Sequence, residues 1–110
     1  MASSSAATVP ERRDVRRHAY DRDLFCGLLP TYETFWATGL DLSPVGVGLL
    51  ADRALQPDDR LAVELSNPGR TFAITREARV VRCAPLLGAH WVVGCVLEPG
   101  LSEAELRALL

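Results

Sequence analysis

The chain has 110 residues, 48% of them hydrophobic, and a formal net charge of −2. A chain of this size can bury the core of one domain without disulfides or a metal, and its slight acidity argues against general binding of DNA or RNA. Because no apolar run is long enough to cross a bilayer, no contact with a membrane is expected.

The first ten residues, MASSSAATVP, are mostly small or polar. They have neither the basic head nor the long apolar stretch of a secretory signal. We therefore expect residues 1–10 to be a disordered tail and residues 11–110 to form a single domain.

The stretch ERRDVRRHAY carries a cluster of arginines. All 12 basic residues of the chain are arginine, and four of them lie close together, namely Arg12, Arg13, Arg16 and Arg17. Arginine presents a planar fork that pairs bidentately with phosphate or with the O6/N7 edge of guanine, and it stacks on bases. Taken alone, the cluster is compatible with a solvated charge run, a nucleic-acid-binding arm or a ligand site.

Short strands separated by turns are expected over most of the remaining chain. The clearest alternation places Leu61, Val63 and Leu65 on one face, between turns at QPDD and NPG. Pro85 and Gly88 are expected to interrupt the chain before a last strand that is apolar on both faces. Six such strands predict an antiparallel all-β barrel or sandwich. They are expected at residues 24–29, 35–42, 47–51, 60–66, 71–81 and 91–97.

The stretch GLDLSPVGVG, residues 39–48, mixes strand-forming residues with polar ones and glycines. In a regular strand, successive side chains alternate between the two faces. We therefore expect Leu40 and Leu42 to point into the core, and Asp41 and Ser43 to point outward.

The outward residues of this stretch suit a guanine. Asp41 can accept hydrogen bonds from the N1–H and N2–H₂ edge of the base, with the Ser43 hydroxyl beside it. Gly46 and Gly48 leave room for a flat ligand to lie against the backbone. A hairpin turn is the other interpretation, because Asp and Ser cap turns and Pro44 fits their second position.

The three cysteines are odd in number and scattered, which argues against a disulfide scaffold and suits a reducing cytoplasm. They have no C-x-x-C spacing, and the two histidines complete no metal-binding pattern. We expect three small buried hydrophobic residues, no metal and no cofactor. The cysteines are Cys26, Cys83 and Cys95, and the histidines are His18 and His90.

The C-terminus predicts a short helix packed on the sheet. Ser102 is followed three residues later by Glu105, which is the spacing of a capping box. Leu101 and Leu106 are placed as a hydrophobic staple. The expected apolar face consists of Leu106, Leu109 and Leu110.

Taken in chain order, the two polar stretches resemble the PilZ family of cyclic di-GMP receptors. That family carries Arg-x-x-x-Arg on an N-terminal segment and then Asp/Asn-x-Ser-x-x-Gly on the barrel. The second motif is complete here, from Asp41 to Gly46. The resemblance covers residues 11–110 and implies a six-stranded antiparallel β-barrel with a short C-terminal α-helix.

The first motif fits in two registers, Arg13 with Arg17 or Arg12 with Arg16. The resemblance implies that the arginines clamp guanine edges and phosphates while the barrel residues hold a guanine. In the family, an arginine just before the motif accompanies binding of two stacked ligand molecules. In the first register Arg12 has this position, so two ligands per chain are predicted. In the second register Glu11 precedes the motif, which favours one ligand. The implied binding residues are Arg12, Arg13, Arg16, Arg17, Asp41, Ser43 and Gly46.

One segment departs from the family pattern. The family continues directly into an apolar strand that contains proline, whereas HAYDRDLF, with Arg22, follows the arginines here. His18 and Tyr20 are expected either to anchor this segment to the barrel or to stack on a base.

No catalytic constellation competes with this interpretation, because neither histidine has a nucleophile at a recognisable spacing. An enzyme is therefore not expected. The resemblance implies a bacterial, cytoplasmic receptor, a monomer or homodimer, whose arginine segment moves on binding cyclic di-GMP and signals to a protein partner. The alternative is an adaptor of the same fold that docks a protein and binds no nucleotide.

Overall fold

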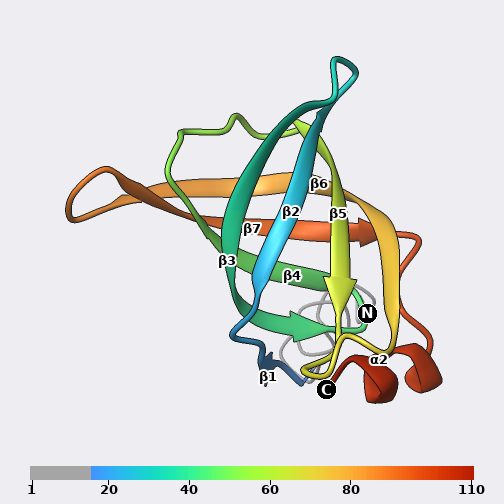
Figure 1. The fold of residues 1–110 in the computed structure, drawn as a ribbon. Helices are drawn as coiled ribbons and strands as arrows, with labels where there is room; N and C mark the ends of the chain where they lie inside the picture. Colours follow the sequence, from blue (N-terminus) through green and yellow to red (C-terminus); the bar gives the residue numbers. More distant parts are fainter. Residues whose placement is uncertain (1–15) are drawn as a thin grey trace, which may run out of the picture.

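The computed structural model describes residues 16–110, so the predicted tail lies outside the described residues. Six antiparallel strands close into a barrel, because β3 pairs with both β2 and β4 (Figure 1). A two-residue strand, β1, adds to β3, and a short helix ends the chain. The predicted all-β barrel is confirmed. The elements are β1 (His18–Ala19), β2 (Asp23–Leu29), β3 (Glu33–Ser43), β4 (Gly46–Ala51), β5 (Arg60–Ser66), β6 (Ala73–Leu86), β7 (His90–Glu98) and α2 (Glu103–Leu109).

The barrel interior is filled by alternate residues of each strand. In β5, Leu61, Val63 and Leu65 are fully buried, as their spacing predicts. Each such side chain contributes about 1.5–3 kcal/mol by leaving water. Arg60 and Glu64, which alternate with them, are exposed or half-buried, so the sequence pattern determines which face of β5 is buried in the core.

The hairpin of β6 and β7 is longer than expected. Pro85 was predicted to interrupt the chain, but it lies within β6, opposite Trp91. This end of the hairpin projects beyond the barrel (Figure 1, left). Pairing of β6 with β5 ends at Arg79, so β7 is the one described strand that pairs with β6 at Pro85. Proline has no N–H to donate, and a strand edge without a second partner tolerates this loss. Gly88 forms the turn, with φ of 82°.

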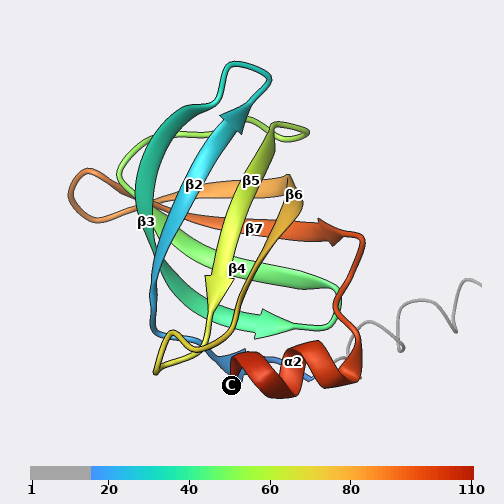
Figure 2. The same ribbon diagram turned by 45° about the vertical axis from the view of Figure 1, so that its right-hand side comes forward.

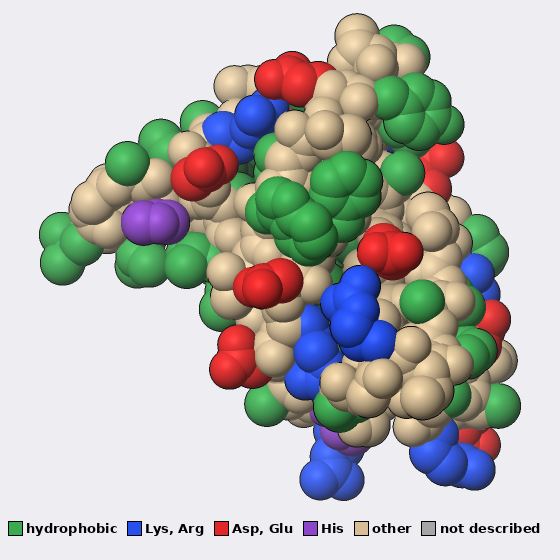
Figure 3. Space-filling model, in the orientation of Figure 1, with side chains coloured by type: hydrophobic (Ala, Val, Ile, Leu, Met, Phe, Trp, Pro, Cys, Tyr) green, Lys and Arg blue, Asp and Glu red, His purple; other side chains and the backbone are tan. Residues whose placement is uncertain are grey.

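Two groups of apolar side chains are exposed on the face seen in Figure 3. Leu86 and Leu87 lie at the tip of the projecting hairpin. Phe25 and Trp36, from β2 and β3, pair on the outer surface with ring centroids 5.0 Å apart.

The helix α2 lies across one end of the barrel, the end at which β1 also lies (Figure 2). The predicted capping box is present, because the Ser102 hydroxyl accepts from the Glu105 amide and the Glu105 carboxylate accepts from the Ser102 amide. Leu106 and Leu109 are buried in the core. Leu110 was expected on the same face but is 42% exposed, since it follows the last helical residue. Between residues 16 and 110, no helix is long and apolar enough to span a membrane.

The three cysteines are free thiols. Cys26 and Cys95 are buried, as expected, and burial raises the pKa of each thiol to about 12. Cys83 is half-buried against the core. In the part of the chain that the structure describes, no group of His, Cys, Asp and Glu side chains could hold a metal ion.

Candidate functional site

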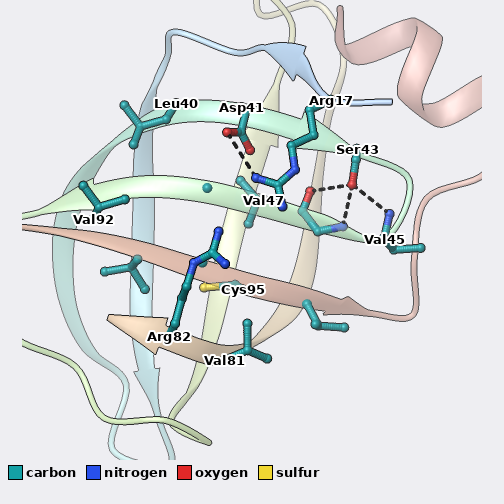
Figure 4. Close-up of a pocket in the computed structure, with 15 residues that line it drawn as sticks. Arg17, Leu40, Asp41, Ser43, Val45, Val47, Val81, Arg82, Val92 and Cys95 are labelled. Atoms are coloured by element: carbon teal, nitrogen blue, oxygen red, sulfur yellow. Dashed lines mark hydrogen bonds and ion pairs between the residues drawn. The ribbon is translucent and has the colours of Figure 1, made fainter. Parts of the chain in front are cut away.

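A pocket of about 340 Å³ lies on the outer face of the barrel, over β3, β4, β7 and β6 (Figure 4). It combines charged side chains with a floor of valines and glycines. The lining residues are Arg17, Leu40, Asp41, Ser43, Val45, Gly46, Val47, Gly48, Val81, Arg82, Val92, Val93, Gly94, Cys95 and Val96.

The pocket is organised around one row of paired residues that crosses four strands. Asp41 of β3 pairs with Gly48 of β4, Gly48 pairs with Gly94 of β7, and Gly94 pairs with Arg82 of β6. A Cβ at Gly48 would lie 2.8 Å from Asp41 Oδ1, and a Cβ at Gly94 would lie 3.3 Å from Arg82 Nε. The two charged side chains therefore lie over the two glycines from opposite sides, which leaves a low floor between an acidic and a basic wall.

A β-bulge directs Asp41 to this face. Phe35 and Ala37 face the core, so strict alternation would also point residue 41 inward. The pairing register with β4 shifts at Leu40, and from Leu42 onward the alternation is inverted. Leu40 was expected to point inward but is 39% exposed, because a bulge puts two successive side chains on the same face.

A second bulge directs Arg82 to the same pocket. Ala78 and Val80 are fully buried, so alternation alone would point residue 82 into the core. The register with β7 shifts at Val81, which is 45% exposed, and Cys83 takes the next inward position. Both walls of the pocket thus depend on a single extra residue in a strand.

Ser43 holds the turn that leads from β3 to β4. Its Oγ accepts hydrogen bonds from the amides of Val45 (3.3 Å) and Gly46 (3.1 Å). Ser43 was expected to point outward but is only 5% exposed, because these contacts hold its hydroxyl against the turn. A Cβ at Gly46 would lie 2.6 Å from the Cys95 carbonyl oxygen, so only glycine lets β4 pass this close to β7. The hairpin-turn interpretation is confirmed, and Ser43 and Gly46 of this turn also line the pocket.

Arg17 reaches the pocket from the segment before β1. Its Nη1 lies 3.8 Å from Oδ2 of Asp41, and the arginine side chain is 61% exposed. The following strand, β1, pairs with the end of β3 and so places Arg17 beside the carboxylate. Arg16 is exposed and does not line the pocket. Arg12 and Arg13, the other predicted binding residues, lie outside the described residues.

Tyr20 anchors this segment to the barrel instead of stacking on a base. Its ring is fully buried, and its hydroxyl donates to the Ser66 carbonyl (2.6 Å) and accepts from the Ser66 amide (2.8 Å). Burial raises the pKa of the phenol. A Cβ at Gly39 would lie 2.6 Å from the Tyr20 carbonyl oxygen, so glycine is needed where the chain crosses β3. His18 is half-buried in β1, and the Arg22 guanidinium lies 5.0 Å from the centre of the Tyr20 ring.

Sequence reasoning missed Arg82 and Gly94 as parts of the pocket. One signal was present, because Arg82 continues the two-residue spacing of the core residues Ala78 and Val80. A charged residue at a core position of a strand indicates either an ion pair or a bulge that turns it outward.

A family model described as the PilZ domain matches residues 10–110. The chain belongs to the PilZ family. The resemblance drawn from the two motifs is confirmed at the level of the family, whose domains serve as ligand-binding and effector modules. No curated protein matches the sequence closely enough to count as a relative.

Solved structures share the PilZ fold at low sequence identity. The PilZ domain of YcgR from Escherichia coli, solved with c-di-GMP, is 22% identical with a TM-score of 0.66, and the match covers 89% of this chain and 86% of that one. MrkH of K. pneumonia in its apo state is 16% identical with a TM-score of 0.60. That match covers 84% of this chain but 46% of the MrkH chain, so the MrkH chain is longer.

Proposed function

We propose that this PilZ domain is a receptor for cyclic di-GMP and binds it in the pocket over β3, β4, β7 and β6. The observation that carries the proposal is the contact between Arg17 and Asp41. It brings an arginine of the first motif and the carboxylate of the second into one pocket. The likeness to the c-di-GMP-bound PilZ domain of YcgR supports the same ligand.

The two side chains have complementary roles toward guanine. Asp41 accepts hydrogen bonds from the N1–H and N2–H₂ groups of the base, while Arg17 pairs with the O6/N7 edge or with a phosphate. The Arg17 side chain is exposed enough to turn from the carboxylate to the ligand. Binding therefore exchanges one ion pair for several charge-assisted hydrogen bonds.

The position of Arg17 also supports one register of the arginine motif. Arg17 lines the pocket, whereas Arg16 does not. We accordingly propose that Arg13 and Arg17 are the motif pair, and that Arg12, directly before them, binds a second molecule of ligand.

We further propose that the ligand orders the arginine segment and so signals to a partner protein. Residues 18–19 already pair with β3, so the change is confined to the chain before His18. Amide hydrogen exchange of residues 11–17 is expected to slow on adding cyclic di-GMP. Equal exchange rates with and without ligand would show that this segment does not act as a switch.

Isothermal titration calorimetry of the purified protein tests the receptor proposal. Cyclic di-GMP should bind well below millimolar, while cyclic di-AMP and GTP serve as controls. Adenine presents an N6 donor where guanine presents the O6 acceptor, so the arginine fork loses half of its pair. Equal heats for the two cyclic dinucleotides would contradict the proposal. No binding of either would favour an adaptor that docks a protein and no nucleotide.

A further inference from the structure

Arg82 stands on the opposite wall of the pocket from Asp41 (Figure 4). Its side chain lies over Gly94 of β7, since a Cβ at Gly94 would lie 3.3 Å from its Nε and 3.4 Å from its Cγ. A side chain on residue 94 would compete for the same space. The glycine and the bulge at Val81 together direct a guanidinium into the pocket, at a position where strand alternation would have buried it.

The charge of Arg82 is not offset by a neighbour in the part of the chain that the structure describes. Most other described arginines lie within 4.0 Å of a carboxylate, including Arg17 in the same pocket. Arg82 makes no ion pair and no side-chain hydrogen bond to residues 16–110. Because Arg17 and Asp41 offset each other, Arg82 leaves the described part of the pocket with one net positive charge.

A cyclic dinucleotide carries two phosphodiester anions on its ribose–phosphate ring, between its two bases. If Asp41 holds a guanine from one wall, the ring extends over the floor of Gly48 and Gly94 toward the other wall. We infer that Arg82 binds a phosphate of the ligand there, as a further binding residue outside both sequence motifs. The inference rests on the proposed function. A guanidinium fork matches two phosphate oxygens at once.

Three variants test this inference. Arg82→Gln removes the charge and keeps most of the length of the side chain, Arg82→Lys keeps the charge without the fork, and Arg107→Gln is the matched control. Arg107 is an exposed arginine on α2 that does not line the pocket, and its one ion pair to a described residue is with Glu103. Calorimetry with cyclic di-GMP at two salt concentrations is the measurement, and the thermal midpoint reports folding.

Arg82→Gln is expected to weaken binding about tenfold or more, because a charge-assisted hydrogen bond is lost. Arg82→Lys should bind more tightly than Arg82→Gln but less tightly than the unmutated protein, since a lysine keeps the charge for phosphate and loses the fork. Arg107→Gln should bind like the unmutated protein, and added salt should weaken the unmutated protein more than Arg82→Gln.

Other outcomes of these measurements would contradict the inference. Unchanged affinity in Arg82→Gln would overturn the inference while leaving the receptor proposal intact. If Arg82→Lys is as weak as Arg82→Gln, the charge by itself contributes nothing to binding, and the phosphate assignment is wrong. If the unmutated protein binds no cyclic di-GMP, the receptor proposal fails, and the inference fails with it.

Discussion

The guanidinium of Arg17 lies 3.8 Å from the carboxylate of Asp41 and joins the segment before β1 to the outer face of β3. Arg17 is 61% and Asp41 34% exposed at the side chain, so water screens the pair. Such pairs contribute about 0–1 kcal/mol to folding. The ion pair therefore contributes little to stability, and it places the two groups side by side in the pocket.

Replacing Arg17 by alanine separates these two roles. Arg17→Ala should abolish binding of cyclic di-GMP, because the first motif loses the member that lines the pocket, while the thermal midpoint stays almost unchanged. Calorimetry and thermal unfolding measure the two effects, and Arg107→Ala is the control for loss of an exposed arginine. A large drop in the midpoint of Arg17→Ala would show instead that the segment is structural.

Two glycines of β4 should respond differently to the same substitution. In Gly48→Ala the new Cβ meets the Asp41 carboxylate, which is the movable end of a side chain, so folding is kept and binding weakens. In Gly46→Ala it meets the backbone oxygen of Cys95, so the strands must shift and the free energy of unfolding falls by about 1–3 kcal/mol. Denaturant unfolding and calorimetry distinguish the two cases. Full affinity in Gly48→Ala would mean that the carboxylate does not need its present position.

Removing the hydroxyl of Tyr20 should affect both stability and binding. Tyr20→Phe leaves the buried amide and carbonyl of Ser66 without their partner, which lowers the free energy of unfolding by about 1–3 kcal/mol. Binding should also weaken, since Tyr20 anchors the segment that carries Arg17. Tyr32→Phe, at a residue that is 65% exposed, is the control and should behave like the unmutated protein. Unchanged affinity in Tyr20→Phe would show that the anchor does not help to position Arg17.

The number of ligands per chain tests the register of the arginine motif. With Arg13 and Arg17 as the pair, the unmutated protein should bind two molecules of cyclic di-GMP. Arg12→Leu should bind about one and retain binding, because the guanidinium that reaches the second molecule is gone. The molar ratio from calorimetry decides this. One ligand per chain in the unmutated protein, or complete loss of binding in Arg12→Leu, would reject the register.

Much of this PilZ domain could be predicted from its sequence, because the relevant signals are local. The alternation of Leu61, Val63 and Leu65 identifies a strand and its buried face, and both residues of the Ser102–Glu105 capping box lie within one helical turn. The spacing from Asp41 to Gly46 predicted the turn between β3 and β4, and both residues line the pocket. These features depend on residues a few positions apart, so closure of the barrel does not alter them.

The faces on which Asp41 and Arg82 lie were decided only by the tertiary structure. One extra residue in a strand inverts the alternation for all the residues that follow. Whether Leu40 and Val81 are such residues depends on their pairing with β4 and β7, which come from other parts of the chain. The sequence therefore determined the chemical groups of this site. Closure of the barrel brought them to one pocket, because the position of each bulge is set by non-local strand pairing.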